Sequence, residues 1–123
     1  NPLARKYGYS AEASAAATGK MAEVITLIAR RLAAQEQQGS RYLVGDSLSA
    51  ADIYWATLSM SVLVPSPEIM PVTRQNQGML TYFAKNSQIP AIADTITKGI
   101  EDHQQYILTT YCETPAVLGG DPL

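Results

Sequence analysis

In the stretch "YLVGDSLSAADIYWA", residues 42–56, a glycine-containing turn leads directly into the start of a helix. Ser49 and Asp52 have the spacing of a capping box, in which the Ser49 hydroxyl accepts from the N–H of Asp52 and the Asp52 carboxylate accepts from the N–H of Ser49. Leu48 and Ile53 occupy the two positions of a hydrophobic staple, which fixes the angle at which a chain enters a helix. We therefore predict that a helix begins at Ser49.

This helix is predicted to run to about Val64, and it is apolar on almost every side. A helix of this kind belongs in the middle of a domain. Its only polar line consists of Tyr54, Thr57 and Ser61, which recur at spacings of three and four residues. A polar stripe on a buried helix must find partners, which are helix carbonyls, neighbouring helices or a pocket.

Hydrophobic periodicity predicts three further helices. The first runs from an N-cap at Ser10 to about Gln38, where Gly39 supplies a stop, and a weaker pattern covers Thr73 to about Lys85. Residues 1–9 and 113–123 show no periodicity and are predicted to be irregular tails. No strand pattern or repeat occurs, so we expect one all-α domain, residues 1–123, with about four principal helices. The last helix is predicted to start near Pro90 and to carry an apolar stripe of Ile92, Ile96, Ile100, His103 and Ile107.

The composition excludes several classes of function. A content of 46% hydrophobic and 16% charged residues in 123 is typical of a globular domain, and no apolar run approaches the roughly 20 residues that span a bilayer. The net charge of -2 and the scattered basic pairs argue against a nucleic-acid partner. A single cysteine excludes an internal disulfide, which makes a reducing cytoplasm the expected compartment. The amino end lacks the apolar core of a secretory signal. It also lacks an initiator methionine, which we interpret as the boundary of a fragment that is either natural or made in the laboratory.

No residue of the chain is predicted to be catalytic or to bind a metal. The capping geometry already explains Asp52, which we interpret as structural. His103 is the only histidine and has no paired cysteines nearby, so we interpret it as an interior histidine and not a metal ligand. Cys112 follows a helix end, where the dipole disfavours a thiolate. Neither a nucleophile elbow nor a glycine loop for phosphate occurs, so an independent enzyme is not expected.

The segment "SRYLVGDSLSAADIYWATL", residues 40–58, resembles the most recognisable part of glutathione transferase C-terminal domains. That part is a Leu-Xaa-Gly-Asp turn followed by Ser/Thr-Xaa-Xaa-Asp-Ile, and its box starts the buried sixth helix of the family. Ser49 and Asp52 match the two capping positions. The stretch "HQQYILTTYCETPAVL", residues 103–118, resembles a tail of bacterial members of uncertain substrate. The resemblance covers Ser10 to about Leu118 and implies a glutathione transferase C-terminal-domain-like helical bundle.

The resemblance also implies a role. In that family a thioredoxin-like N-terminal domain binds glutathione and supplies the catalytic residue, and nothing in this chain matches that domain or the family's fourth helix. The chain would form a wall of the apolar pocket in which a small electrophile meets glutathione, the co-substrate of a cytoplasmic, dimeric detoxification enzyme. It would bind no cofactor itself and would be inactive alone. Because the box helix starts near the cleft between the domains, the residues expected to line that pocket are Tyr54, Thr57 and Ser61.

An alternative from a different class is a non-enzymatic helical module for protein interaction or scaffolding. Such modules resemble the transferase-like domains that assemble translation factors and aminoacyl-tRNA synthetases. A thioredoxin-like domain upstream, with a cis-proline and a nucleophile-activating residue, would favour the enzyme. The sequence leaves the electrophile, the oligomeric state and the origin of the fragment open.

Overall fold

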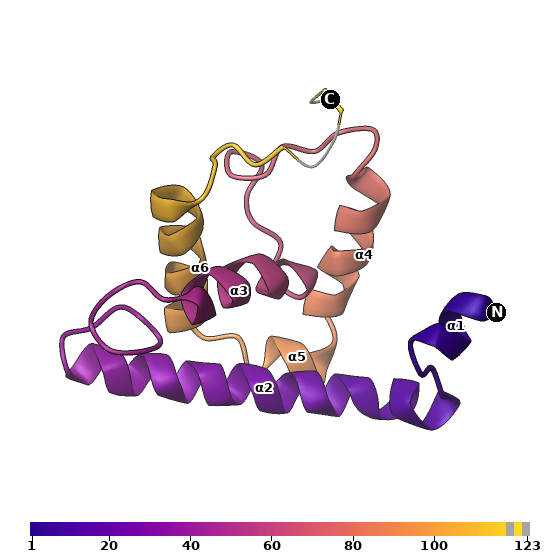
Figure 1. Cartoon of the computed structure of the whole chain (residues 1–123), viewed down its shortest axis with the longest axis horizontal. Coiled ribbons are helices and arrows are strands. Elements are labelled where there is room, and N and C mark those ends of the chain that lie inside the picture. The colour runs from indigo at the N-terminus through magenta and orange to yellow at the C-terminus, as the bar shows by residue number, and fades with distance from the viewer. Residues whose placement is uncertain (118–119, 122–123) are drawn as a thin grey trace.

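The computed structural model of the chain describes residues 1–117 and 120–121, and all of its regular elements are helical. The predicted all-α class is therefore confirmed. A long helix, α2, runs along one side of the molecule, and the elements α3 to α6 lie together on the other side of it (Figure 1). The elements are α1 (Pro2–Lys6), α2 (Ala11–Gln37), α3 (Ala50–Leu58), a 3₁₀ turn (Ser59–Ser61), α4 (Gln77–Ser87), α5 (Pro90–Ala93) and α6 (Lys98–Tyr111).

The long helix α2 has the ends that local sequence predicts. The Ser10 hydroxyl accepts from the N–H of Ala13 at 3.0 Å, and Gly39 adopts a φ of 79° just after the helix ends. The first turns of the helix, residues 11–17, are exposed to solvent. With α1 they extend beyond the other helices (Figure 1).

Residues 1–9 were expected to be irregular, and this expectation is wrong for α1. The Asn1 side chain accepts from the N–H of Leu3 at 2.9 Å, and Pro2 occupies a first-turn position that its fixed φ suits. None of the residues of α1 is buried. The element is one short capped turn of helix.

The box helix α3 is shorter than predicted and only one of its faces is buried. It ends at Leu58 and tightens into the 3₁₀ turn, whereas the prediction extended it to Val64. Asp52 and Ala56 have no exposed surface, but Tyr54 and Leu58 are 66% and 71% exposed. The expectation of burial on almost every side is therefore wrong for the face that carries Tyr54 and Leu58.

The early end of α3 has a cause elsewhere in the fold. Gln104, on α6, donates from Nε2 to the hydroxyl of Ser59 at 3.0 Å and to the carbonyl of Leu63 at 2.8 Å. The Ser59 hydroxyl in turn donates to the carbonyl of Ala56 at 3.2 Å. Side-chain bonds of this kind compete with the regular helical ladder. The chain beyond Leu58 therefore follows the geometry that Gln104 requires.

The last predicted helix is divided into α5 and α6. Thr97 interrupts it and caps α6, because its hydroxyl accepts from the N–H of Ile100 at 3.3 Å. The apolar stripe is nevertheless buried as predicted, with Ile92, Ile100 and Ile107 at 3% exposure or less. The periodicity thus identified the buried face correctly but did not reveal the break.

The helix predicted to start at Thr73 starts later in the structure. Helix α4 begins at Gln77, because Thr73 and Asn76 form a turn before it. The N–H of Thr73 donates to Oδ1 of Asn76 at 2.8 Å, and the N–H of Asn76 donates to the Thr73 hydroxyl at 3.1 Å. This reciprocal pairing satisfies two backbone donors outside the helix.

Two apolar clusters form the core, and α6 contributes to both. Ile100 packs into the cluster near α2 and α5, and Ile107 packs into the cluster beneath α3. Helix α3 packs directly on α6, whereas α2 packs on α5 and α6. In the part of the chain that the structure describes, no helix combines the length and the apolar character needed to cross a membrane. The clusters consist of Ile25, Leu32, Leu43, Val62, Ile92 and Ile100, and of Ala56, Ile69, Ile107 and Leu108.

Candidate functional site

The carboxylate of Asp52 joins three parts of the fold. Its Oδ2 accepts from the N–H of Ser49 at 3.0 Å and lies 3.3 Å from the Ser49 hydroxyl. Its Oδ1 accepts from the N–H of Leu43 at 2.9 Å and lies 2.8 Å from Nε2 of His103. Asp52 has no exposed surface. The side chain predicted to cap α3 therefore also holds the preceding loop and the α6 helix.

The capping box predicted from Ser49 and Asp52 is present, and its carboxylate half is the stronger one. The N–H of Asp52 is already bonded to the carbonyl of Ser49 at 3.1 Å, which leaves less for the Ser49 hydroxyl to satisfy. Ile53 packs against the core cluster beneath α3, whereas Leu48 is 37% exposed. The hydrophobic staple between Leu48 and Ile53 stays a prediction.

The loop before α3 is anchored to α2 through its carbonyl groups. Arg31 donates from Nε to the carbonyl of Leu43 at 2.8 Å. Gln35, which is buried, donates from Nε2 to the carbonyls of Tyr42 at 2.9 Å and Gly45 at 2.6 Å. Gly45 has a φ of 62°, a conformation that costs other residues energy. The glycine therefore makes the turn that the opening stretch requires, and α2 fixes the turn in place.

The contact between Asp52 and His103 is a hydrogen bond to a charged carboxylate. Burial raises the pKa of Asp52, but the hydrogen bonds from His103 and from the N–H groups of Leu43 and Ser49 outweigh it, so the net pKa is lowered. The carboxylate is thus ionised and accepts only, which assigns a proton to Nε2 of His103. The other ring nitrogen, Nδ1, is buried and has no hydrogen-bond partner among the described residues.

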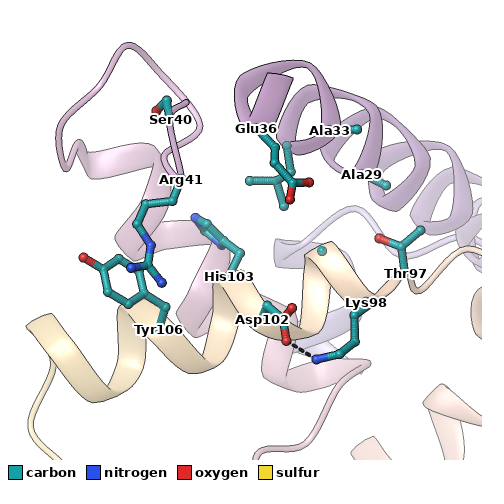
Figure 2. Close-up of a pocket in the computed structure, with 12 residues that line it drawn as sticks. Ala29, Ala33, Glu36, Ser40, Arg41, Thr97, Lys98, Asp102, His103 and Tyr106 are labelled. Carbon is teal, nitrogen blue, oxygen red and sulfur yellow. Dashed lines mark hydrogen bonds and ion pairs between the residues drawn. The ribbon is translucent and has the colours of Figure 1, made fainter. Parts of the chain in front are cut away.

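His103 lies at the wall of a pocket of about 590 Å³ between α2 and α6. One face of α2 forms one side, one face of α6 forms the other, and the start of the loop after α2 closes one end (Figure 2). The two helices supply residues at spacings of three and four, as the same face of a helix requires. The lining residues are Ala29, Leu32, Ala33, Glu36, Ser40, Arg41, Thr97, Lys98, Gly99, Asp102, His103 and Tyr106.

Of the four charged residues that line the pocket, two form an ion pair with each other and two do not. Lys98 and Asp102 form an ion pair with each other on α6. The guanidinium of Arg41 lies over the ring of Tyr106, with its carbon 3.3 Å from the ring centroid. Glu36 projects from α2 toward α6 (Figure 2). The pocket therefore offers one anion and one cation besides the Lys98 pair.

A cluster of tyrosines borders the Arg41 end. The Tyr42 hydroxyl lies 2.6 Å from that of Tyr111 and 3.2 Å from that of Tyr106. Hydrogen bonds to Tyr106 and Tyr111 raise the pKa of Tyr42. Hydrogen bonds to Tyr42 and Tyr111, with the nearby Arg41 cation, lower the pKa of Tyr106. The cluster orients the Tyr106 ring on which Arg41 rests.

The residues predicted to bind substrate lie elsewhere. Tyr54 is exposed on the outer face of α3, and the hydroxyls of Thr57 and Ser61 donate to the carbonyls of Ile53 at 2.8 Å and Leu58 at 2.9 Å. None of Tyr54, Thr57 and Ser61 lines the pocket between α2 and α6. Their role in substrate binding stays a prediction for the α3 face.

Sequence reasoning missed the residues that form this pocket. Glu36 and Arg41 are ordinary surface residues in the sequence, and Tyr106 is one of seven tyrosines. Their only signal is that Glu36 shares a helical face with Ala29 and Ala33. That signal becomes informative only when the neighbouring helix is known.

Comparisons with known proteins give no further assignment. No protein-family model, no curated protein and no solved structure matches the chain. Among the described residues, no three His, Cys, Asp or Glu side chains lie together in a way that could hold a metal ion. The motif of residues 40–58 and the geometry of the pocket between α2 and α6 are therefore the features that indicate a function.

Proposed function

We propose that this chain is the helical half of a glutathione transferase-like protein and forms one wall of its apolar substrate pocket. The observation that carries the proposal is the buried capping box of Ser49 and Asp52, built within the segment that resembles the family. A box with no exposed carboxylate surface serves architecture, as the resemblance implies. The chemistry then belongs to a thioredoxin-like domain outside this chain, which would bind glutathione as co-substrate.

The outer face of α3 supports the proposal. Tyr54 and Leu58 are spaced four residues apart on one side of the helix, and both are largely exposed. Exposed apolar groups at such a spacing suit an apolar ligand or a covering domain. By holding a small apolar electrophile beside a glutathione thiolate, this face would contribute proximity and not acid-base chemistry.

The test compares the 123-residue chain with a longer protein that includes the region encoded directly before Asn1. The longer protein should be retained on immobilised glutathione and should conjugate glutathione to 1-chloro-2,4-dinitrobenzene, and the chain alone should do neither. In the longer protein, Leu58→Ser should raise the KM for the electrophile, whereas Val24→Ser on the exposed side of α2 should not. Retention of the chain alone, or equal KM values for both variants, would contradict the proposal.

A non-enzymatic interaction module is the second candidate, and exposed apolar side chains on α1 and α2 favour it. Leu3, Tyr7 and Leu27 are each more than 60% exposed, and they belong to α1, the residue that follows it and α2. Exposed apolar side chains of this size suit contact with a protein partner or a second copy. Sedimentation of the longer protein with Leu27→Ser tests this candidate. Dissociation of an assembly without loss of conjugation activity would assign the Leu27 side of α2 to association. An assembly without any conjugation activity would favour the interaction module.

A further inference from the structure

We infer that the pocket between α2 and α6 binds a small zwitterion with an apolar side chain, of the α-amino acid class. This inference concerns a different surface from the α3 face and does not depend on the proposed function. It rests on three features of the pocket, which are a carboxylate, a guanidinium and a wall of small apolar residues.

The carboxylate is that of Glu36. It projects from α2 into the pocket (Figure 2), and it has neither an ion pair nor a side-chain hydrogen bond with any described residue. Lys98, the nearest lysine along the pocket wall, is bound to Asp102. Glu36 is therefore available to a ligand that carries a positive charge.

The guanidinium is that of Arg41. Its carbon lies 3.3 Å from the centroid of the Tyr106 ring, a contact that holds the guanidinium over the ring face and leaves its N–H groups free. Within residues 1–117 and 120–121, no acceptor pairs with an N–H group of this guanidinium, and no carboxylate forms an ion pair with it. A planar guanidinium held in this way suits a carboxylate, which it binds through two parallel hydrogen bonds.

The two charges line one pocket without pairing with each other. A ligand with a single charge would pair with either Glu36 or Arg41 and would leave the other residue without a partner of opposite charge. A zwitterion satisfies both at once. The opposite charges of an α-amino acid lie close together, and its side chain is then free to contact a third surface.

The remaining features determine the rest of the ligand. His103 lies at the pocket wall with only 5% of its surface exposed, and its Nε2 is bonded to Asp52, so it contributes the floor of the pocket and not a charged contact. Ala29, Leu32 and Ala33 leave room for an apolar side chain on the α2 side.

The test uses L-leucine and its two halves, isoamylamine, which lacks the carboxylate, and 4-methylpentanoate, which lacks the amine. His103 is the only histidine, so its Cε1–H proton gives one assignable NMR signal beside the pocket. Leucine should shift this signal with a Kd of about 1 mM, an affinity reasonable for a ligand of this size. Each half should bind at least about tenfold more weakly, since each loses one charged contact.

Two variants separate the charges. Glu36→Gln should remove the advantage of leucine over 4-methylpentanoate, and Arg41→Gln should remove its advantage over isoamylamine. Both residues are exposed, so neither substitution should disturb the core, and an unchanged His103 signal without ligand checks this. Glu12→Gln and Arg30→Gln, exposed positions elsewhere on α2, are the matched controls and should bind leucine as the parent chain does.

The outcomes are distinct. Loss of one preference in each variant supports the inference. A parent chain whose His103 signal does not move in leucine at many times the expected Kd overturns it. Leucine binding that survives both substitutions unchanged also overturns it, because the charged anchors would then have no part in recognition.

Discussion

Asp52 and His103 lie 51 positions apart in the chain and meet at 2.8 Å in the interior, with side chains that are 0% and 2% exposed. One residue starts α3 and the other lies on the buried face of α6. The same carboxylate accepts from the backbone of Leu43 and Ser49. A single ionised group therefore holds the loop, the helix start and the last helix together, and its loss should affect all three.

Replacing Asp52 with alanine should lower the free energy of unfolding by about 3–5 kcal/mol, because it leaves the donors of His103, Leu43 and Ser49 buried without an acceptor. Urea denaturation followed by circular dichroism measures this change. The matched control is Asp46→Ala, which removes an exposed carboxylate from the same turn and should change stability by no more than about 0.5 kcal/mol. Similar losses for both variants would mean that Asp52 serves as a surface group.

Stability should also depend on pH through Asp52. Its pKa in the folded chain is lowered from the ordinary value of 3.8, because the hydrogen bonds outweigh the effect of burial. A group whose folded pKa is depressed stabilises the fold above its unfolded pKa, and this contribution disappears as the pH falls through the folded value. Urea unfolding from about pH 6 to about pH 2 should therefore show a loss of stability that begins near 3.8 and continues below it. Asp52→Asn should lack this component, and parallel pH profiles for the two proteins would refute the assignment.

Gln104 should be much more important for stability than its neighbour. It is buried and donates to Ser59 and Leu63, whereas Gln105 is exposed. Gln104→Ala should cost about 1–3 kcal/mol, because it leaves buried acceptors unpaired, and Gln105→Ala should cost almost nothing. Thermal unfolding of both variants provides the measurement. If the two melting temperatures agree, the contact between α6 and the 3₁₀ turn does not determine where α3 ends.

Two glycine-to-alanine substitutions should change the stability of the chain in opposite directions. Gly45 has a φ of 62°, so Gly45→Ala should destabilise the chain by about 1 kcal/mol although the added methyl group meets no atom within 4 Å. Gly19 lies inside α2 with equally open surroundings, so Gly19→Ala should stabilise it by about 0.5–1 kcal/mol. Differential scanning calorimetry distinguishes the two. A Gly45→Ala chain as stable as the parent would show that the turn does not need a left-handed residue.

The sequence predicted those helix ends that are encoded locally. The cap at Ser10, the stop at Gly39 and the box at Ser49 each depend on contacts between residues a few positions apart, so single-chain reasoning reached them. The end of α3 and the start of α6 depend on Gln104 and Thr97, whose effects come from packing or from one side-chain bond inside a convincing apolar pattern. Periodicity describes a buried face and does not show where the backbone breaks along it.

The candidate site could be predicted less well than the fold. Asp52 was correctly placed as a cap, but its pairing with His103 needs the packing of α3 on α6, which no local pattern provides. Glu36 and Arg41 are solvent-facing by their own sequence context, and only the approach of α2 to α6 makes them neighbours. A site formed by residues of two helices therefore produces no recognisable sequence pattern in either helix.

If Asp52 stabilises the fold through His103, the two side chains must be energetically coupled, and a double-mutant cycle measures this coupling. Urea unfolding of the parent chain, Asp52→Asn, His103→Gln and the double variant gives the coupling energy between the two side chains. A hydrogen bond to a buried carboxylate predicts a coupling of about 1.5–3 kcal/mol. Single effects that add to within about 0.5 kcal/mol would show that the two residues stabilise the domain independently, and would contradict the claim.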